Sequence, residues 1–252
     1  MLGFGKKRTG DQPAPRTPRG HRAYAVGDVH GRLDLLNKLL ARIERDAARS
    51  PARRTSLIFV GDLIDRGPDS RGVVERLRAY RHDRIRAHFL AGNHEEVLLR
   101  LLAGERGILT SWLQFGGAEC LKSYGCDPAE LAGKSESSGL QLVKQAIPES
   151  HSSFIGGFGD TLTFGDYLFV HAGIRPGVDL SLQSQSDLRW IRSPFLEDDS
   201  DHGMVVVHGH TINPEVVERP NRIGIDTGAY RTNVLTALAL EGEARWVLNT
   251  LE

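Results

Sequence analysis

Five short segments of the chain combine glycine with residues that can bind metal ions or move protons. They are 27–31 (GDVHG), 61–67 (GDLIDRG), 92–95 (GNHE), 171–173 (HAG) and 208–211 (HGHT), and at least four of them directly follow an apolar run. Unpaired, these carboxylate, amide and imidazole groups would be costly at the edge of a core. Gathered around two divalent cations, they would form a hydrolytic site.

The first metal-binding candidates follow two predicted strands. Asp28 and His30 stand at i and i+2 after 22–26, so in extended backbone both side chains point the same way toward one cation. Asp62 follows the apolar run 57–60, and its two carboxylate oxygens can bridge two cations. Taken alone, each segment fits an ordinary turn better. Their repetition after successive strands favours the metal site.

Three later residues complete the candidate ligand set. Asn93 offers a neutral amide oxygen, although it would also suit the start of the helix that follows. His171 and His210 each come at the end of a strand-like run. One such histidine is more often structural, but two of them beside three earlier sites make coincidence a poor explanation. His208 is assigned to packing or to support of the site.

Two residues in the same segments are candidates for proton transfer. His94 is adjacent to Asn93 and would point in another direction, so we predict that it is the general acid. Asp65 would orient His94 and hold its proton. In isolation, His94 would better fit a hydrogen-bonded histidine at a helix start.

The composition is ordinary for a globular protein. The chain has 252 residues, 40% of them apolar, with 32 basic and 32 acidic residues, so net charge gives no reason to expect nucleic acid or an anionic membrane. Cys120 and Cys126 are expected to be free thiols in a reducing cytoplasm. No apolar run approaches the roughly 20 residues of a membrane span. Residues 1–20 are predicted to be a disordered basic tail.

The order of the predicted elements indicates an α/β fold. Strands are predicted over 22–26, 57–60 and 85–91, and helices over 33–43, 73–80 and 94–102. Such alternation implies parallel strands with right-handed crossovers, and ligands bind beyond the C-terminal ends of these strands. The first three motifs lie there.

The second half of the chain follows a different pattern. Residues 103–163 are predicted to be a helical insertion that either caps the cleft or only packs beside it, with helices around 108–121 and 140–147 and a loop over 134–139. Later strands are predicted over 167–170, 204–207, 222–225, 234–240 and 244–248.

The five motifs, in this order, resemble those of calcineurin-type metallophosphoesterases, and more narrowly the bacterial and phage branch of the phosphoprotein phosphatases. The resemblance spans about 22–248 and implies a four-layer α/β/β/α sandwich with a helical insertion, forming a single catalytic domain over 21–252. It implies that Asp28, His30 and Asp62 hold one metal ion, and that Asp62, Asn93, His171 and His210 hold the other. His94 with Asp65 would be the acid pair. Arg66 would grip the phosphate with a second arginine, for which Arg192 fits better than Arg189.

The implied activity is hydrolysis of phosphomonoesters, foremost phosphoserine and phosphothreonine in proteins, by direct attack of a hydroxide shared by two divalent metal ions. Manganese is expected, with iron or zinc as alternatives. The expected partner is a phosphoprotein or small phosphoester substrate, with no nucleic acid and no membrane, and the sequence gives no oligomeric state. Ile212 replaces the second histidine of the Gly-His-x-His motif of many nucleases in the superfamily, which favours the phosphatase branch.

Two other functions are alternatives to phosphomonoester hydrolysis. Diadenosine tetraphosphate hydrolysis is the alternative activity. Symmetric hydrolases of that kind typically carry Phe-Gly-His-Trp where this chain has HGHT at 208–211, which weakens the alternative. A non-catalytic phospho-ligand-binding protein would require loss of a metal ligand or of the acid, and none is missing.

Overall fold

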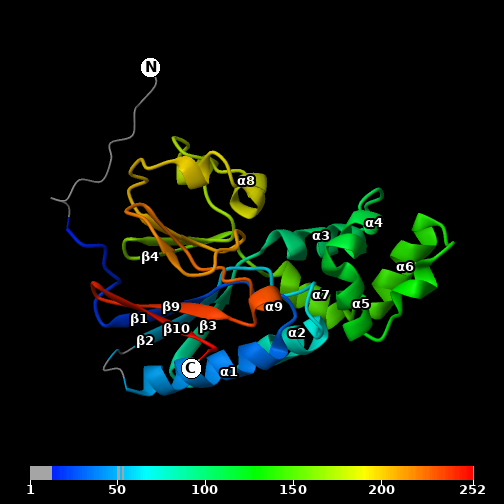
Figure 1. The fold of residues 1–252 in the computed structure, drawn as a ribbon, viewed down its shortest axis with the longest axis horizontal. Coiled ribbons are helices and arrows are strands. Elements are labelled where there is room, and N and C mark those ends of the chain that lie inside the picture. The colour runs from blue at the N-terminus through cyan, green and yellow to red at the C-terminus, as the bar shows by residue number, and fades with distance from the viewer. Residues whose placement is uncertain (1–12, 50–51, 53, 252) are drawn as a thin grey trace.

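The computed structural model describes residues 13–49, 52 and 54–251, which form two five-stranded sheets (Figure 1). The first sheet has the order β10-β9-β1-β2-β3 and the second has the order β4-β5-β6-β8-β7. The first comprises β1 (His21–Val26), β2 (Arg54–Phe59), β3 (Ile85–Phe89), β9 (Thr236–Glu241) and β10 (Ala244–Asn249). The second comprises β4 (Thr161–Phe164), β5 (Tyr167–Val170), β6 (Val205–His208), β7 (Val217–Glu218) and β8 (Arg222–Gly224).

Helices lie on the two outer faces of the paired sheets (Figure 1). α1 (Leu33–Ala48), α2 (Ser70–Arg78) and α3 (Asn93–Leu102) belong to the apolar layer on the outer side of the first sheet. α8 (Gln185–Trp190) and the short turn η4 (Phe195–Glu197) cover the second sheet. The layers are therefore helix, sheet, sheet and helix, so the α/β/β/α sandwich implied by the motifs is confirmed.

Strand alternation divides the core between these layers. Ile58 of β2 and Phe169 of β5 face each other's sheet, whereas Leu57 faces the helices and Leu168 faces α8. Each such buried side chain contributes about 1.5–3 kcal/mol relative to exposure. Apolar packing on both faces of each sheet therefore holds the strand ends in fixed positions.

The first sheet begins with the predicted parallel strands. β1 pairs with β2 and β2 with β3 in parallel, with Val26 beside Phe59 and Phe59 beside Phe89. In the second sheet β5 and β6 are likewise parallel. The C-terminal ends of these strands therefore meet at one edge of the sandwich, and the loops that follow them carry the five motifs.

The predicted insertion, 103–163, is largely helical. It contains α4 (Leu109–Trp112), the π-helical turn η1 (Leu113–Gly117), α5 (Ala118–Ser123), the 3₁₀ turn η2 (Pro128–Leu131), α6 (Glu136–Ala146) and α7 (Glu149–Gly156), and its last residues begin β4. The predicted loop 134–139 is wrong from Glu136 onward, because α6 begins at that residue. Ser135 Oγ accepts a hydrogen bond from the backbone N–H of Ser138 at 3.2 Å, so serines that suggested a loop form a helix cap.

The predicted basic tail is described only from residue 13. Its described end contacts the fold: the N–H of Arg16 donates to Asp166 Oδ2 at 3.0 Å, and the N–H of Thr17 donates to the carbonyl of Gly242 at 2.9 Å. Here the structure differs from the prediction, because distant turns supply partners that composition cannot reveal. The rest of the predicted tail, 1–12, lies outside the described residues.

Two further short elements among the described residues are η3 (Leu180–Leu182) before α8 and α9 (Ala229–Thr232) before β9. The HGHT motif begins at the last residue of β6, His208, and continues into the loop that follows it. Cys120 and Cys126 are free thiols, as predicted. Among the described residues, the helices are all too short or too polar to cross a membrane.

Candidate active site

The side chains predicted to bind metal lie together at the C-terminal edge of the sheets. Asp28 follows β1, Asp62 follows β2, and Asn93 is the first residue of α3, after β3. His171 follows β5, and His210 follows β6 by two residues. All of these residues, with His30, are buried.

One half of the cluster is centred on Asn93. Its Oδ1 lies 3.0 Å from His171 Nε2 and 2.9 Å from His210 Nδ1. Asp62 Oδ1 lies 3.4 Å from the same His171 nitrogen. Four ligand-type atoms from four loops therefore converge within hydrogen-bond or near hydrogen-bond distance.

The other half of the cluster lies on the far oxygen of Asp62. Asp62 Oδ2 is 3.5 Å from His30 Nε2. Asp28 accepts the backbone N–H of His210, with its Oδ2 at 3.1 Å. Asp28 and His210 are thus direct neighbours although 182 positions separate them in the chain, and Asp62 lies between the two halves.

Backbone carbonyls fix the orientation of two imidazoles. His30 Nδ1–H donates to the carbonyl of Ile64 at 2.8 Å, and His171 Nδ1–H donates to that of Val60 at 2.9 Å. The Nε2 atom of each ring is then left with its lone pair directed into the cluster. This arrangement is typical of histidines that bind metal.

The loops carrying these residues are backbone-strained. Non-glycine residues with positive φ include His30 (45°), Asp62 (51°), Asp65 (69°), Arg66 (66°) and His210 (63°). Each such conformation costs on the order of 1–3 kcal/mol and tends to occur at functional sites. Apolar packing below the strand ends offsets this cost.

Two glycines are required by the carboxylates that pack on them. A Cβ at Gly92 would lie 2.1 Å from Asp62 Oδ1, and a Cβ at Gly209 would lie 2.1 Å from Asp28 Oδ1. Any larger residue would therefore displace a candidate ligand. This explains why glycine precedes Asn93 and His210 in their motifs.

Burial sets the protonation states of the imidazoles. It lowers the pKa of His210 to about 3, and it also lowers the pKa values of His30 and His171. These rings are neutral near pH 7, which is the form that binds metal.

The pKa values of two carboxylates in the cluster are shifted in opposite directions. Burial opposes ionisation of Asp62, but the neighbouring histidines, His171 foremost, outweigh it and hold the pKa of Asp62 below its usual range. Burial, and then Asp226 and Asp62, raise the pKa of Asp28 well above its usual range. Negative charge is therefore crowded beside Asp28, and a divalent cation would relieve this crowding.

The contacts fit divalent ions better than a metal-free cluster. With the tautomer fixed by Val60, His171 Nε2 directs a lone pair at the oxygens of Asn93 and Asp62, so electron-pair donors face one another. His210 Nε2 and Asp226 Oδ2 are buried without a hydrogen-bond partner among the described residues.

Two groups of side chains could each hold an ion. One is Asp62, His171 and His210, and the other is His30, Asp62 and His94, with ligand atoms within 4.8 Å in each group. The second group contains His94 where the motifs implied Asp28. Mixed nitrogen and oxygen donors suit manganese, iron or zinc.

The two residues predicted to form the acid pair are hydrogen-bonded to each other. His94 Nδ1–H donates to Asp65 Oδ2 at 2.7 Å, and both side chains are buried. Burial opposes protonation of His94, but Asp62 and Asp65 outweigh it and raise the pKa of His94. The imidazolium form therefore persists to higher pH than in a free histidine.

Sequence reasoning missed two residues that support the site. Trp112, from the insertion, donates its Nε1–H to Asp65 Oδ2 at 3.0 Å. Glu95 accepts the backbone N–H groups of Asp62 and Leu63, both at 2.8 Å, and so fixes the loop after β2. The position of Glu95 in the GNHE motif was a usable signal, whereas nothing in the sequence marks Trp112.

The two predicted phosphate-binding arginines are both at the site. Arg66 donates to His30 Nε2 at 3.0 Å, and its guanidinium lies 4.9 Å from the ring centroid of Tyr230. Arg192 lines the pocket beside the cluster. Arg189 instead forms an ion pair with Asp160 at 2.6 Å. The choice of Arg192 over Arg189 therefore agrees with their positions.

The pocket beside the cluster is lined by both polar and aromatic side chains. Its volume is about 390 Å³. The polar residues include Asn93, His94, His210 and the two arginines, and the aromatic residues, called the aromatic wall below, are Trp112, Phe115 and Trp190. Phe115 and Trp190 remain 67% and 38% exposed, unusually so for rings beside a buried polar cluster. The insertion supplies Trp112 and Phe115, so it forms a wall of the site.

Comparison with known proteins establishes the family. A sequence model of the calcineurin-like phosphoesterases matches residues 21–243. The chain therefore belongs to this family of metallophosphoesterases.

The names of the related sequences describe two kinds of activity. The chain is 26% identical over 233 residues to the asymmetrical bis(5'-nucleosyl)-tetraphosphatase PrpE of Oceanobacillus iheyensis, covering 84% of this chain and 86% of the relative. It is 30% identical over 216 residues to a symmetrical bis(5'-nucleosyl)-tetraphosphatase of Legionella pneumophila, covering 85% and 66%. A 38% identical match to serine/threonine-protein phosphatase 1 of Salmonella typhimurium covers 94 residues, 37% and 38% of the two chains.

A solved structure confirms the fold. A candidate diadenosine tetraphosphatase superposes with a TM-score of 0.61 and 21% identity, covering 94% of this chain and 98% of that one. A likeness at this identity supports the architecture alone.

Proposed function

We propose that this chain is a divalent-metal-dependent hydrolase that cleaves bis(5'-nucleosyl) tetraphosphates. The observation that carries the proposal is that one pocket is lined both by the proposed phosphate-binding arginines and by the exposed rings of Phe115 and Trp190. A substrate that joins a phosphate chain to a flat ring suits such a lining. The relatives that cover most of the chain support the same substrate class.

The cluster is proposed to hold the metal ions. When bound by Asp28, His30, Asp62, Asn93, His171 and His210, two divalent ions would supply Lewis-acid charge and an activated water. Manganese remains our expectation, with iron or zinc as alternatives.

Other residues would bind the phosphate chain and move the proton. Arg66 and Arg192 hold phosphoryl oxygens, and Tyr230 keeps the Arg66 guanidinium in place. Hydrolysis breaks one P–O–P link, and the oxygen of water stays on one of the two phosphates. His94 gives a proton to the departing phosphate oxygen, while Asp65 and Trp112 hold its ring.

The aromatic wall would bind the base. Stacking of a base on an aromatic side chain is worth about 1–3 kcal/mol. Phe115 and Trp190 therefore contribute binding energy that a phosphoserine side chain could not use, and this distinguishes the two substrate classes.

A second candidate function is phosphoserine or phosphothreonine hydrolysis in proteins, as the motifs first implied. It is supported by the match to the Salmonella phosphatase over 94 residues. The same ligand set and acid pair would serve this reaction, so the choice depends on the pocket wall. A cytoplasmic location stays a prediction.

A substrate panel tests the proposal. With manganese present, we expect kcat/KM for diadenosine tetraphosphate to exceed that for a phosphoserine peptide. Phe115→Ala and Trp190→Ala should each raise KM for the dinucleotide by about 5–150-fold, equivalent to about 1–3 kcal/mol, and leave turnover of phosphoserine unchanged. Leu182→Ala is the matched control, because Leu182 is 74% exposed and lies outside the pocket lining. Preference for the phosphopeptide would favour the second candidate.

A further inference from the structure

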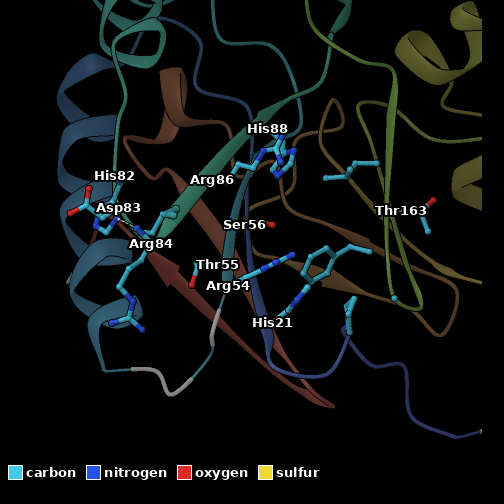
Figure 2. Close-up of a pocket in the computed structure, with 15 residues that line it drawn as sticks. His21, Arg54, Thr55, Ser56, His82, Asp83, Arg84, Arg86, His88 and Thr163 are labelled. Carbon is cyan, nitrogen blue, oxygen red and sulfur yellow. Dashed lines mark hydrogen bonds between the residues drawn. The ribbon is translucent and has the colours of Figure 1, made fainter.

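A second cavity lies at the opposite end of the first sheet from the candidate active site (Figure 2). Its volume is about 700 Å³, and its walls are the N-terminal ends of β1, β2 and β3 together with β4. The candidate metal ligands that the first sheet supplies follow the C-terminal ends of β1, β2 and β3. The described residues that line the two pockets do not overlap.

Strand alternation places two arginines on the face of the first sheet that is turned toward the second sheet, and both side chains are exposed near the N-terminal ends of their strands. Arg54, Ser56 and Ile58 share one face of β2, as do Arg86 and Leu90 at β3. Ile58 and Leu90 belong to the core between the sheets. Arg54 and Arg86 therefore occupy positions on a face that is apolar further along the same strands, and Figure 2 shows them with the cavity lining.

The lining carries a net positive charge that comes from arginines. It contains Arg54, Arg84 and Arg86 together with His21, His82 and His88, whereas Asp83 is the one acidic residue among the described residues that line it. Burial lowers the pKa of His88, so that ring adds no charge near pH 7. Within the described ranges, 13–49, 52 and 54–251, no carboxylate forms an ion pair with Arg54 or Arg86. Like charges gathered in a concave site raise the local potential and favour an anion.

The rest of the lining suits the body of a small molecule. His21, paired in register with Arg54, lies 6.0 Å from the ring of Phe164 on β4, centroid to centroid. The two rings are half-buried, so one surface of this pair is open to a flat group. A cavity of this volume falls within the range of about 300–1,000 Å³ usual for ligand sites.

A simpler explanation is that the arginines prevent the exposed edges of the sheets from pairing with other chains. β3 and β4 are edge strands, and inward-pointing charges discourage association between sheet edges. That role requires charge on the strands, but it requires neither a cavity nor a second wall carrying the His21–Phe164 pair.

We propose that this cavity is a second ligand site, which binds a phosphate-bearing anion of nucleotide size. Arg54 and Arg86 would hold the phosphate groups, since the planar guanidinium matches phosphate oxygens. A planar ring would rest on the His21–Phe164 pair. The site is separate from the catalytic cluster and does not depend on the function proposed above.

Calorimetric titration of the full chain in EDTA tests the site, with ATP, inorganic phosphate and adenosine as separate probes. Wild type should bind ATP, and Arg54→Glu/Arg86→Glu should weaken binding at least tenfold, the fold-change expected when charge-assisted hydrogen bonds are lost. Arg106→Glu/Arg219→Glu makes the same change in net charge outside the cavity and should bind as wild type. Arg66→Ala alters the catalytic pocket alone, so it should leave the ATP binding that depends on Arg54 and Arg86 unchanged.

Each other result decides against the proposal. If wild type does not bind ATP, the arginines only prevent association between sheet edges. If affinity falls with Arg66→Ala and not with the Arg54/Arg86 pair, the ligand is in the catalytic pocket. If adenosine binds as tightly as ATP, the arginines do not hold phosphate. Should the double glutamate variant fail to fold, Arg54→Gln/Arg86→Gln replaces it, and unchanged affinity there also overturns the proposal.

Discussion

Replacing Asp65 by asparagine isolates its role as the partner of His94. The change keeps the shape of the side chain and its Trp112 contact but removes the charge from a hydrogen bond of 2.7 Å between buried groups. A hydrogen bond to a charged group is worth about 1.5–3 kcal/mol, which corresponds to a loss of about 10–150-fold in rate if the bond acts fully in the transition state. Loss of the acid itself, in His94→Ala, should cost about 10²–10⁴-fold.

Substrates with different leaving groups distinguish a loss of proton transfer from a loss of substrate binding. Phosphoserine needs a proton at its departing oxygen, whereas nitrophenolate leaves without one. The Asp65→Asn variant should therefore be slow with phosphoserine and close to wild type with 4-nitrophenyl phosphate, with the bound metal unchanged.

The pH profile gives a second signature. Because Asp65 helps to raise the pKa of His94, its removal should move the alkaline limb of kcat to lower pH. Trp112→Phe, which keeps the carboxylate and loses the indole N–H, should shift that limb less. Equal loss on both substrates, or an alkaline limb that does not move, would refute the assignment of His94 as the acid held by Asp65.

Three further predictions concern stability and metal binding. Burial lowers the pKa of His208 from 6.5 to about 4, so between these values the unfolded chain binds a proton that the folded chain excludes. Stability from this residue is therefore lost as pH falls, by about 2 kcal/mol between pH 7 and pH 5. In urea unfolding in EDTA, the unfolding free energy of His208→Asn should depend less on pH than that of wild type. The same pH dependence in both proteins would contradict this prediction. Gly209→Ala should lower manganese binding in calorimetry, because its Cβ would meet Asp28, while Gly156→Ala, with open space around it, should bind as wild type. Ser135→Ala should cost about 1 kcal/mol of unfolding free energy through loss of the α6 cap, and Ser152→Ala, inside α7, should cost less.

The candidate site was predictable because its residues occupy equivalent places in a repeated pattern. Asp28, Asp62 and Asn93 follow three parallel strands, and parallel pairing brings such positions to one edge. The strands themselves were predictable from short apolar runs bounded by glycine.

Contacts made by distant side chains could not be predicted in the same way. Trp112 reaches Asp65 through a helical insertion with no local link to the motifs. The aromatic wall likewise depends on how α4, η1 and α8 pack, and the sequence sets no spacing for that. Arg54 and Arg86 are exposed arginines, and only the strand register and the packing of the sheets show that they share one face and line one cavity.

Substrate choice was the least predictable feature. The motifs describe the groups that act on phosphorus, which phosphoproteins and dinucleoside polyphosphates share. Phe115 and Trp190, which would distinguish the two substrates, lie outside the five motifs.

Metal content measured on the purified chain tests the central claim most directly. Titration of EDTA-treated protein with manganese should give two ions per chain, and Asp62→Asn should bind less than one, because Asp62 lies between the two halves of the cluster. Asp34→Asn, a matched change at an exposed ion pair with Arg32, should still bind two. Phosphoester turnover that persists undiminished in metal-free protein, or full manganese binding by Asp62→Asn, would contradict the account.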